Sequence, residues 1–333
     1  MNARPRILVT NWVHEATLQQ LALLGDVDAN ETRMPWPREE VMRRAEKADA
    51  ILAFMPDSID ARLLARCKQL RVVACALKGY DNFDLDACTQ AGVFVTIVPD
   101  LLTEPTAELA VGLAIGLGRN VREGDALVRS GQFDGWRPVL YGTGLDGSVV
   151  AIVGMGHVGR AVAQRLAGFG CRMLGVDPSA ETPPGMIRVT LHRALDMADF
   201  VIVCAPLTPA SRHLIGNDAL ARMKNGALLI NVGRGSVVDE SAVLAALETG
   251  KLGGYAADVF EMEDWALPDR PEAIDERLRT HPRTLFTPHL GSAVTRVRQA
   301  IELRAVDNIA DVLEGRRPRD AINEPTQPLA KAG

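Results

Sequence analysis

The stretch Val149-Val-Ala-Ile-Val-Gly-Met-Gly-His-Val-Gly-Arg-Ala-Val-Ala-Gln-Arg-Leu166 decides the fold. Strand-forming residues 149–153 run directly into Gly154-Met-Gly-His-Val-Gly159, and a helical pattern follows. Each glycine has a physical use here: Gly154 permits a tight turn, Gly156 lets backbone N–H groups approach a phosphate, and Gly159 permits close helix–strand packing. This spacing between a strand and a helix predicts a site for the pyrophosphate of a dinucleotide.

A second predicted strand ends at Asp177, close to the ~20-residue spacing expected of dinucleotide-binding proteins. Its carboxylate would accept hydrogen bonds from the adenosine ribose and would repel a 2′-phosphate. Pro178 and Ser179 follow, with no neighbouring arginine to accommodate NADP. The alternative, a plain strand–turn–helix without a ligand, does not account for the acidic residue. We therefore predict NAD as the cofactor.

Short β-rich runs alternate with helical patterns along the rest of the chain, which predicts parallel sheets covered by helices on both faces. The predicted strands are 6–10, 50–54, 71–77, 93–98, 148–153, 173–176, 199–204, 227–231, 254–259 and 284–287. An apolar helix that begins near Pro105 and a helix at 293–314 indicate two crossings between domains. The predicted fold class is α/β, with two doubly wound parallel-sheet domains. A Rossmann-type NAD domain, 102–290, is inserted in a flavodoxin-like substrate domain of residues 1–101 and 291–333.

Composition narrows the class of protein. The 333 residues carry a net charge of −5 and are 47% hydrophobic, as in soluble globular proteins. This charge argues against nucleic acid or an anionic membrane as a partner. Five scattered cysteines without CxxC spacing indicate core positions in a reducing compartment, with no metal site and no disulfide framework. The apolar run near the N-terminus is too short for a signal peptide or membrane span, so we expect a cytoplasmic protein.

Three chemically distinct side chains follow predicted strands after the glycine motif. Arg234 lies between two glycines in NVGRGSVVDE, Glu263 ends AADVFEME, and His289 lies in TPHLG. A histidine paired with a carboxylate is a positioned general acid/base, and an arginine holds an anion in a fork of donors. Each residue alone has a structural explanation. Together, after a dinucleotide motif, they predict an active site.

These four motifs, in this order, resemble those of the D-2-hydroxyacid dehydrogenases, and the resemblance covers essentially the whole chain. It implies Arg234 as the substrate clamp, Glu263 as the partner of the histidine, and His289 as the acid/base. It also implies a homodimer built largely through the nucleotide domains, and active-site closure between the domains. The predicted cofactor contacts are Gly154, Met155, Gly156, His157, Val158, Gly159, Asp177, Pro178, Pro206, Val232, Asp258 and His289.

Lys78, in CALKGYDN, departs from the wider family, where a small or apolar residue stands in its place. Lysine is rare in this chain, at 6 of 37 basic residues. An added ammonium group at the end of a strand predicts a substrate with more negative charge than a hydroxy acid. The segments ALKGYDNFD, AFMPD and GYAADVFEMEDWA resemble one branch of the family, which oxidises phosphite to phosphate with NAD.

The predicted function is therefore NAD-dependent oxidation of phosphite, a small tetrahedral anion that two cations, Lys78 and Arg234, would hold. Water would attack phosphorus as hydride leaves for NAD, and His289 would take the proton of the water. Arg298 shares a helical stripe with apolar residues, so it is assigned either an internal salt bridge or a place in the site. The predicted substrate contacts are Lys78, Gly79, Arg234, Arg298, Met55, Tyr141 and Trp136.

Two other functions stay open. One is an ordinary D-2-hydroxyacid dehydrogenase of the glyoxylate or hydroxypyruvate reductase type, in which His289 exchanges a proton with the substrate hydroxyl or carbonyl. The other belongs to a different class: an NAD-sensing interaction protein, as in the related C-terminal-binding corepressors. The Arg–Glu–His set argues only mildly against this last function, because those proteins retain it.

Overall fold

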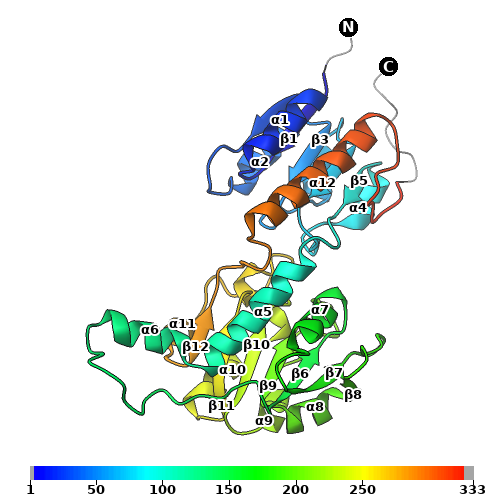
Figure 1. Cartoon of the computed structure of the whole chain (residues 1–333). Coiled ribbons are helices and arrows are strands. Elements are labelled where there is room, and N and C mark those ends of the chain that lie inside the picture. The colour runs from blue at the N-terminus through cyan, green and yellow to red at the C-terminus, as the bar shows by residue number, and fades with distance from the viewer. Residues whose placement is uncertain (1–3, 326–333) are drawn as a thin grey trace. The chain divides into compact units, whose positions relative to one another are not determined.

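The computed structural model describes residues 4–325, which form two compact units (Figure 1). Unit 1 contains the residues up to Leu102 and those from Ala293 onward, and unit 2 contains Thr103–Ser292. The predicted crossings, after residues 101 and 290, lie beside these boundaries. Each unit has its own parallel sheet and its own apolar core. The predicted α/β fold class with two parallel sheets is confirmed.

The sheet of unit 1 has five parallel strands in the order β2-β1-β3-β4-β5, the order of flavodoxin-like folds. Its strands are β1 (Arg6–Val9), β2 (Asp26–Ala29), β3 (Ala50–Ala53), β4 (Val72–Cys75) and β5 (Phe94–Thr96). In β3 and β4 every residue is buried, because helices cover both faces of the sheet. The edge strand β2 was not predicted, since its sequence, DVDA, is short and leaves both aspartates exposed.

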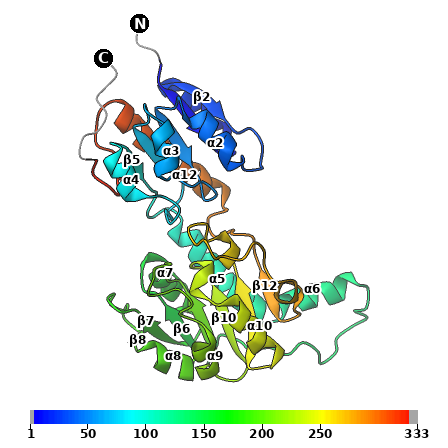
Figure 2. The same cartoon turned by 180° about the vertical axis from the view of Figure 1, so that it is seen from behind.

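Two groups of helices cover this sheet. The helices are α1 (Glu15–Leu24), α2 (Arg38–Ala45), α3 (Ala61–Arg66), α4 (Leu85–Gln90) and α12 (Thr295–Leu313). α1 and α12 pack on one face through Leu21 and Ile301, whereas α2, α3 and α4 cover the other, as the opposite views show (Figures 1 and 2). Helix α12 comes from the far end of the chain, so unit 1 is discontinuous.

The sheet of unit 2 has seven parallel strands in the order β12-β11-β10-β9-β6-β7-β8. They are β6 (Val149–Val153), β7 (Arg172–Val176), β8 (Ile187–Arg188), β9 (Phe200–Val203), β10 (Ala227–Asn231), β11 (Leu252–Ala257) and β12 (Thr284–Phe286). Strand order along the sheet reverses between β6 and β9. Ligands of such sheets bind beyond the carboxyl ends of the strands at this switch point. The two-residue edge strand β8 was not predicted.

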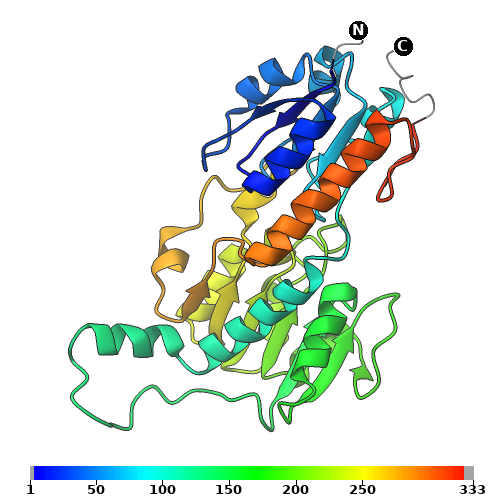
Figure 3. The same cartoon turned by 45° about the horizontal axis from the view of Figure 1, so that its top comes forward.

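The helices of unit 2 are α5 (Thr103–Gly118), α6 (Val121–Arg129), α7 (His157–Leu166), α8 (Leu191–Met197), α9 (Asn217–Arg222), α10 (Glu240–Glu248) and α11 (Glu276–Thr280), with short 3-10 turns η1 (Gly235–Val237) and η2 (Glu261–Glu263). α5 and α7 cover one face of the sheet, and α8, α9 and α10 cover the other. α6 and the segment after it stand out from the body of unit 2 (Figure 3). Within residues 4–325, no helix has both the length and the apolar character that a membrane crossing requires.

Candidate active site

The glycine loop after β6 has the geometry that its sequence predicts. Gly154 has φ 95°, and a Cβ there would lie 2.8 Å from the backbone nitrogen of Ala205. A Cβ on Gly159 would lie 1.9 Å from the carbonyl oxygen of Gly154, so only glycine lets α7 start so close to β6. A Cβ on Gly156 would meet nothing within 4 Å, and no side chain caps α7. The open, uncapped helix start fits the pyrophosphate of a dinucleotide.

Asp177, directly after β7, is bound into this loop. Its carboxylate accepts the backbone N–H of Met155 at 2.8 Å and that of Ala180 at 2.7 Å. Desolvation alone would raise the pKa of Asp177, but these hydrogen bonds hold it below its ordinary value. The side chain thus stays anionic at the end of the strand, where the ribose of a dinucleotide is expected.

An arginine from the neighbouring strand lies beside Asp177. No arginine adjoins Asp177 in the sequence, but the structure brings Arg188 of β8 beside it. The Arg188 Nη2 donates to the carbonyl oxygens of Pro178 at 3.0 Å and Asp177 at 3.2 Å. Because Arg188 reaches this position across the sheet, spacing along the chain could not reveal it.

The other predicted cofactor contacts differ in exposure. Met155 and Val232 are buried, and the Met155 side chain belongs to the core beneath α7. His157, Pro178 and Pro206 are exposed, and Val158 is half-buried. Cofactor contact through the Met155 side chain would require it to leave the core. For all of these residues contact with NAD stays a prediction.

His289 lies in a strained turn after β12. Its φ is 55°, in the left-handed region that is uncommon for residues other than glycine, although histidine adopts it more often than most. Buried Asp258 stabilises this turn, because its carboxylate accepts the backbone N–H groups of Leu290 at 2.6 Å and Gly291 at 2.8 Å. Desolvation by burial raises the pKa of Asp258. Asp258 was also predicted as a cofactor contact, and that role stays a prediction.

Glu263 and His289 form the pair that the motifs predict. Oε2 of Glu263 lies 2.6 Å from Nδ1 of His289, and Oε1 accepts the N–H of Phe260 at 3.0 Å. The two side chains are partly exposed, at 21% and 30%. The η2 turn therefore fixes Glu263, and Glu263 orients the imidazole of His289. Nε2 is then the ring nitrogen available for chemistry.

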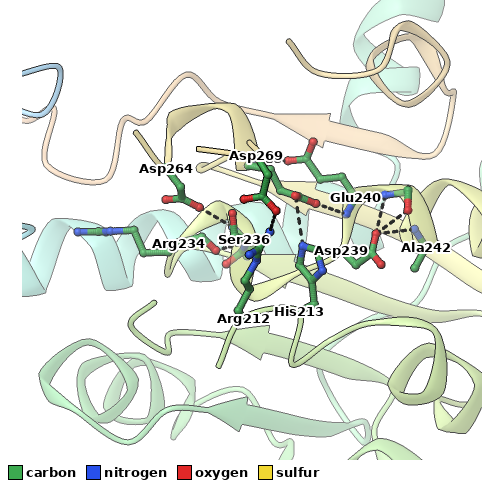
Figure 4. Close-up of polar contacts among 12 residues, drawn as sticks. Arg212, His213, Arg234, Ser236, Asp239, Glu240, Ala242, Asp264 and Asp269 are labelled. Carbon is green, nitrogen blue, oxygen red and sulfur yellow. Dashed lines mark hydrogen bonds and ion pairs between the residues drawn. The ribbon is translucent and has the colours of Figure 1, made fainter. Parts of the chain in front are cut away.

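Arg234 follows β10 at the start of η1 (Figure 4). The side-chain amide of Asn231 donates to the Arg234 carbonyl at 2.9 Å and accepts the N–H of Gly233 at 3.1 Å. A Cβ on Gly233 would lie 2.4 Å from the carbonyl oxygen of Ala205, so a larger residue could not form this turn. The half-buried Arg234, Glu263 and His289 thus all follow neighbouring strands, β10, β11 and β12.

In unit 1, Lys78 and Gly79 follow β4 and are both half-buried. The Cys75 thiol donates to the Gly79 carbonyl at 3.5 Å, which closes the turn that holds Lys78. Met55 follows the neighbouring strand β3, and the Asn82 amide donates to its carbonyl oxygen at 2.7 Å. Lys78, Gly79 and Met55 therefore gather at the carboxyl edge of one parallel sheet, where ligands of such sheets bind.

Arg298, near the start of α12, reaches the same edge of this sheet. Its Nη1 donates to the carbonyl oxygen of Ala76 at 3.4 Å, two residues before Lys78, and its guanidinium lies 5.9 Å from the ring centre of Phe54. Desolvation lowers the pKa of Arg298, although the charge of Glu302 partly offsets this. Glu302 itself accepts a hydrogen bond from Thr17 and pairs with His14 at 3.0 Å.

Trp136 and Tyr141 were predicted to wall the substrate pocket. Both lie in the segment that follows α6, and they are 83% and 80% exposed. Within the part of the chain that the structure describes, that exposure leaves them without the packing expected of pocket walls. Their role in the site stays a prediction.

Comparison with known proteins agrees with these motifs. A family model for the NAD-binding domain of D-isomer specific 2-hydroxyacid dehydrogenases matches residues 111–291. The glyoxylate reductase of Thermofilum pendens is 36% identical over 331 residues, which cover 97% of this chain and 95% of that protein. The glyoxylate reductase of Thermococcus litoralis is 32% identical over 330 residues, covering 96% and 97%.

Solved structures are similar over the same length. A protein of Thermus thermophilus has a TM-score of 0.89 at 36% identity, covering 95% of this chain and 99% of its own. The NADPH-dependent glyoxylate/hydroxypyruvate reductase of Sinorhizobium meliloti, in complex with NADP and malonate, has a TM-score of 0.85 at 29% identity. That match covers 98% of this chain and 100% of the reductase.

Proposed function

The chain belongs to the D-isomer specific 2-hydroxyacid dehydrogenases, and we propose that, within this family of NAD(P)-dependent oxidoreductases, it oxidises phosphite to phosphate with NAD. The observation that carries the proposal is the pair of cations at one sheet edge of unit 1. Half-buried Lys78 follows β4, and the Arg298 guanidinium bonds to the carbonyl of Ala76, two residues before it.

Positive charge concentrated in this way favours a compact, highly charged anion. A hydroxy acid carries one carboxylate, which one arginine can hold in a bidentate pair. Phosphite spreads up to two negative charges over three oxygens and has no apolar group to bind. Arg234, predicted from its motif as the substrate clamp, would supply a third cation.

The proposed reaction transfers a hydride from phosphorus to the cofactor. A P–O bond forms between water and phosphorus as the P–H bond breaks, and the hydride leaves with its electron pair. Bound NAD would accept that hydride, so that phosphorus is oxidised and NAD is reduced. The proton released by water goes to Nε2 of His289, because Nδ1 faces Glu263. Glu263 stabilises the imidazolium that forms, while Lys78, Arg234 and Arg298 hold the phosphite oxygens.

A second candidate is reduction of glyoxylate or hydroxypyruvate, which the names of the relatives favour. In that reaction hydride would reach the substrate carbonyl carbon from NADH or NADPH, and His289 would donate a proton to the carbonyl oxygen. Arg234 would hold the substrate carboxylate. Lys78, which stands where the wider family has a small or apolar residue, has no assigned part in binding such a substrate, and we therefore place this candidate second.

We also propose that the protein acts as a homodimer. The segment from α6 onward exposes apolar side chains, among them Phe133 at 51% and Trp136 at 83%, and a second copy would cover them. Light scattering would measure a mass of two chains for the parent and of one chain for Trp136→Asp. Two chains for both proteins would assign the contact elsewhere.

One assay separates the candidate functions. The purified protein is mixed with NAD and phosphite while the absorbance of NADH is followed, and glyoxylate with NADH or NADPH is tested in parallel. Phosphite turnover with little glyoxylate reduction supports the proposal. Brisk glyoxylate reduction without phosphite turnover assigns the second candidate. Inertness toward every substrate, with NAD still bound, would favour an NAD-sensing interaction protein.

A further inference from the structure

The two turns that carry Arg234 and Glu263 contact each other backbone to backbone. A Cβ on Gly235, in η1, would lie 1.9 Å from the carbonyl carbon of Phe260 and 2.3 Å from the nitrogen of Glu261. Any side chain at position 235 would therefore push η1 away from η2. Their spacing decides how far the anion clamp lies from the acid/base pair.

Two carboxylates, those of Glu240 and Glu261, join η2 to the helix that follows η1. Oε1 of Glu240 accepts the N–H of Glu261 at 2.9 Å, and Oε1 of Glu261 accepts the N–H of Glu240 at 2.8 Å. This reciprocal pair joins the start of α10 to the start of η2, and His213 lies 3.2 Å from the other oxygen of Glu261 (Figure 4). Burial raises the pKa of Glu240 to about 7, and the nearby acidic groups add to this rise.

Asp264 also joins the two turns. Its Oδ2 accepts the N–H of Ser236 at 2.6 Å, and the two residues are buried, at 6% and 1% exposure. Asp264 directly follows Glu263, and Ser236 lies two residues after Arg234. One short hydrogen bond therefore links the segment of the acid/base partner to the segment of the anion clamp (Figure 4).

We infer that Asp264 is a positioning residue, whose carboxylate oxygen fixes the turn of Arg234 against the turn of Glu263. It acts by accepting the backbone N–H of Ser236, and it is covalently linked to Glu263, the residue before it in the chain. The inference rests on the proposed roles of Arg234 and of the Glu263–His289 pair, but it does not depend on which substrate is turned over.

The reason lies in what a buried backbone N–H requires. Without an acceptor, the Ser236 N–H would be buried and unsatisfied, so η1 would move until it found water or another acceptor. Such a shift displaces Arg234 from Glu263, and a displacement of about 1 Å at a reacting group can cost on the order of 100-fold in rate.

Three substitutions and one control test the inference in the full-length protein. Asp264→Ala removes the acceptor, Asp264→Asn keeps an acceptor oxygen without charge, and Asp264→Glu keeps the charge on a longer arm. Asp275→Ala is the control, because Asp275 accepts the N–H of Arg277 at 2.7 Å in an exposed turn elsewhere in unit 2. Thermal unfolding and NAD affinity are measured for every protein.

We expect Asp264→Ala to lower kcat/KM by roughly 10- to 100-fold, with NAD affinity within about twofold of the parent. Asp264→Asn should restore most of the rate, and Asp264→Glu should not. The loss should appear mainly as a raised KM for the anionic substrate, because Asp264→Ala moves the turn of Arg234, whereas Glu263 stays fixed by its own turn. A merely structural role would lower the temperature of thermal unfolding without raising this KM.

Opposite results overturn the inference. Equal kcat/KM and an equal KM for the anionic substrate in Asp264→Ala would show that the hydrogen bond positions nothing. An active Asp264→Glu beside an inactive Asp264→Asn would assign the effect to charge; this pair decides the matter even if Asp264→Ala does not fold. Each variant is compared with the parent on whichever substrate the parent turns over, so failure of the phosphite proposal remains distinguishable.

Discussion

Asp258 and His289 are joined through the backbone, since the His289 N–H donates to the Asp258 carbonyl oxygen at 2.9 Å and the Asp258 carboxylate accepts the next two N–H groups. The catalytic histidine proposed here thus depends on an aspartate that need not touch any ligand. Asp258 can therefore have two roles, one in holding the turn of His289 and one in contacting the cofactor, and a substitution distinguishes them.

Asp258→Asn should therefore impair catalysis more than cofactor binding. An amide can accept only on one side, so one N–H of the 290–291 turn loses its acceptor. We expect kcat/KM to fall about tenfold or more, with NAD affinity nearly unchanged. Steady-state kinetics and NAD titration by fluorescence measure the two quantities. A large loss of NAD affinity would assign Asp258 to the cofactor.

Lys78→Ala should raise the KM for phosphite and leave NAD affinity unaltered. A lost charge-assisted hydrogen bond is worth about 1.5–3 kcal/mol, which corresponds to roughly 10- to 100-fold. Lys68→Ala is the matched control, because Lys68 is an exposed lysine of the same unit. An equal KM for phosphite in the parent and in Lys78→Ala would show that this lysine does not bind phosphite.

The pH dependence of the two candidate reactions should differ in sign. Phosphite oxidation needs neutral His289 to take a proton, so kcat/KM should fall toward acid pH. Glyoxylate reduction needs the protonated imidazole, so kcat/KM should fall toward alkaline pH. His289→Asn should lower either rate by about 10²- to 10⁴-fold, the usual contribution of a general acid/base. A loss of less than about threefold would show that another group, and not His289, transfers the proton.

Arg188→Ala should change the choice of cofactor. Because the guanidinium lies beside the carbonyls of Asp177 and Pro178, it is placed to pair with a 2′-phosphate, whereas the Asp177 carboxylate repels one. We expect NAD to be preferred, and we expect the variant to lose about tenfold in kcat/KM for NADP with NAD unaffected. Arg172→Ala, an exposed arginine on β7, is the control. An unchanged ratio of NADP to NAD use would exclude Arg188 from cofactor recognition.

Asp57 should make unit 1 more stable at acid pH. Burial raises the pKa of Asp57 from 3.8 to about 6, although the hydrogen bonds from Thr10 and Phe54 oppose this rise. A group whose pKa is raised on folding stabilises the fold below its unfolded pKa, and this contribution is lost as pH rises through about 6. The parent should therefore lose on the order of 2–3 kcal/mol from this group between about pH 4 and pH 7.

The side chain at position 57 of Asp57→Asn cannot ionise. The free energy of unfolding of this variant should therefore increase relative to that of the parent as the pH rises. Urea unfolding at about pH 5 and about pH 8 measures the difference on either side of the raised pKa, and Asp26→Asn, at an exposed position, is the control. A difference between Asp57→Asn and parent that does not vary with pH would show that Asp57 titrates normally.

Sequence patterns predicted the parts of this protein that short segments determine. The strand, turn and helix of 149–166 specify one another locally, and buried runs such as β3 and β4 are apolar throughout. Arg234, Glu263 and His289 were found because each lies in a motif directly after a strand. The edge strands β2 and β8 were missed, because edge strands are short and need no apolar pattern.

Contacts between distant segments could not be predicted in this way. Asp264 meets Ser236 across 28 positions, and Arg188 reaches Pro178 from the next strand of the sheet. No spacing rule relates such residues, because their proximity depends on strand order and on the packing of two turns. For Trp136 the sequence and the structure differ in another way. Its motif predicts that it walls a pocket, but in the single chain its side chain is exposed.

The discontinuity of unit 1 has a consequence during synthesis on the ribosome. Ile301, Ala305 and Ile309 of α12 cover one face of the first sheet, and the Ile322 N–H donates to the carbonyl oxygen of Val95 in its edge strand at 2.9 Å. The nascent chain must therefore carry a sheet face that α1 alone covers while all of unit 2 is translated. The core of unit 1 can therefore be completed only after α12 has been synthesised.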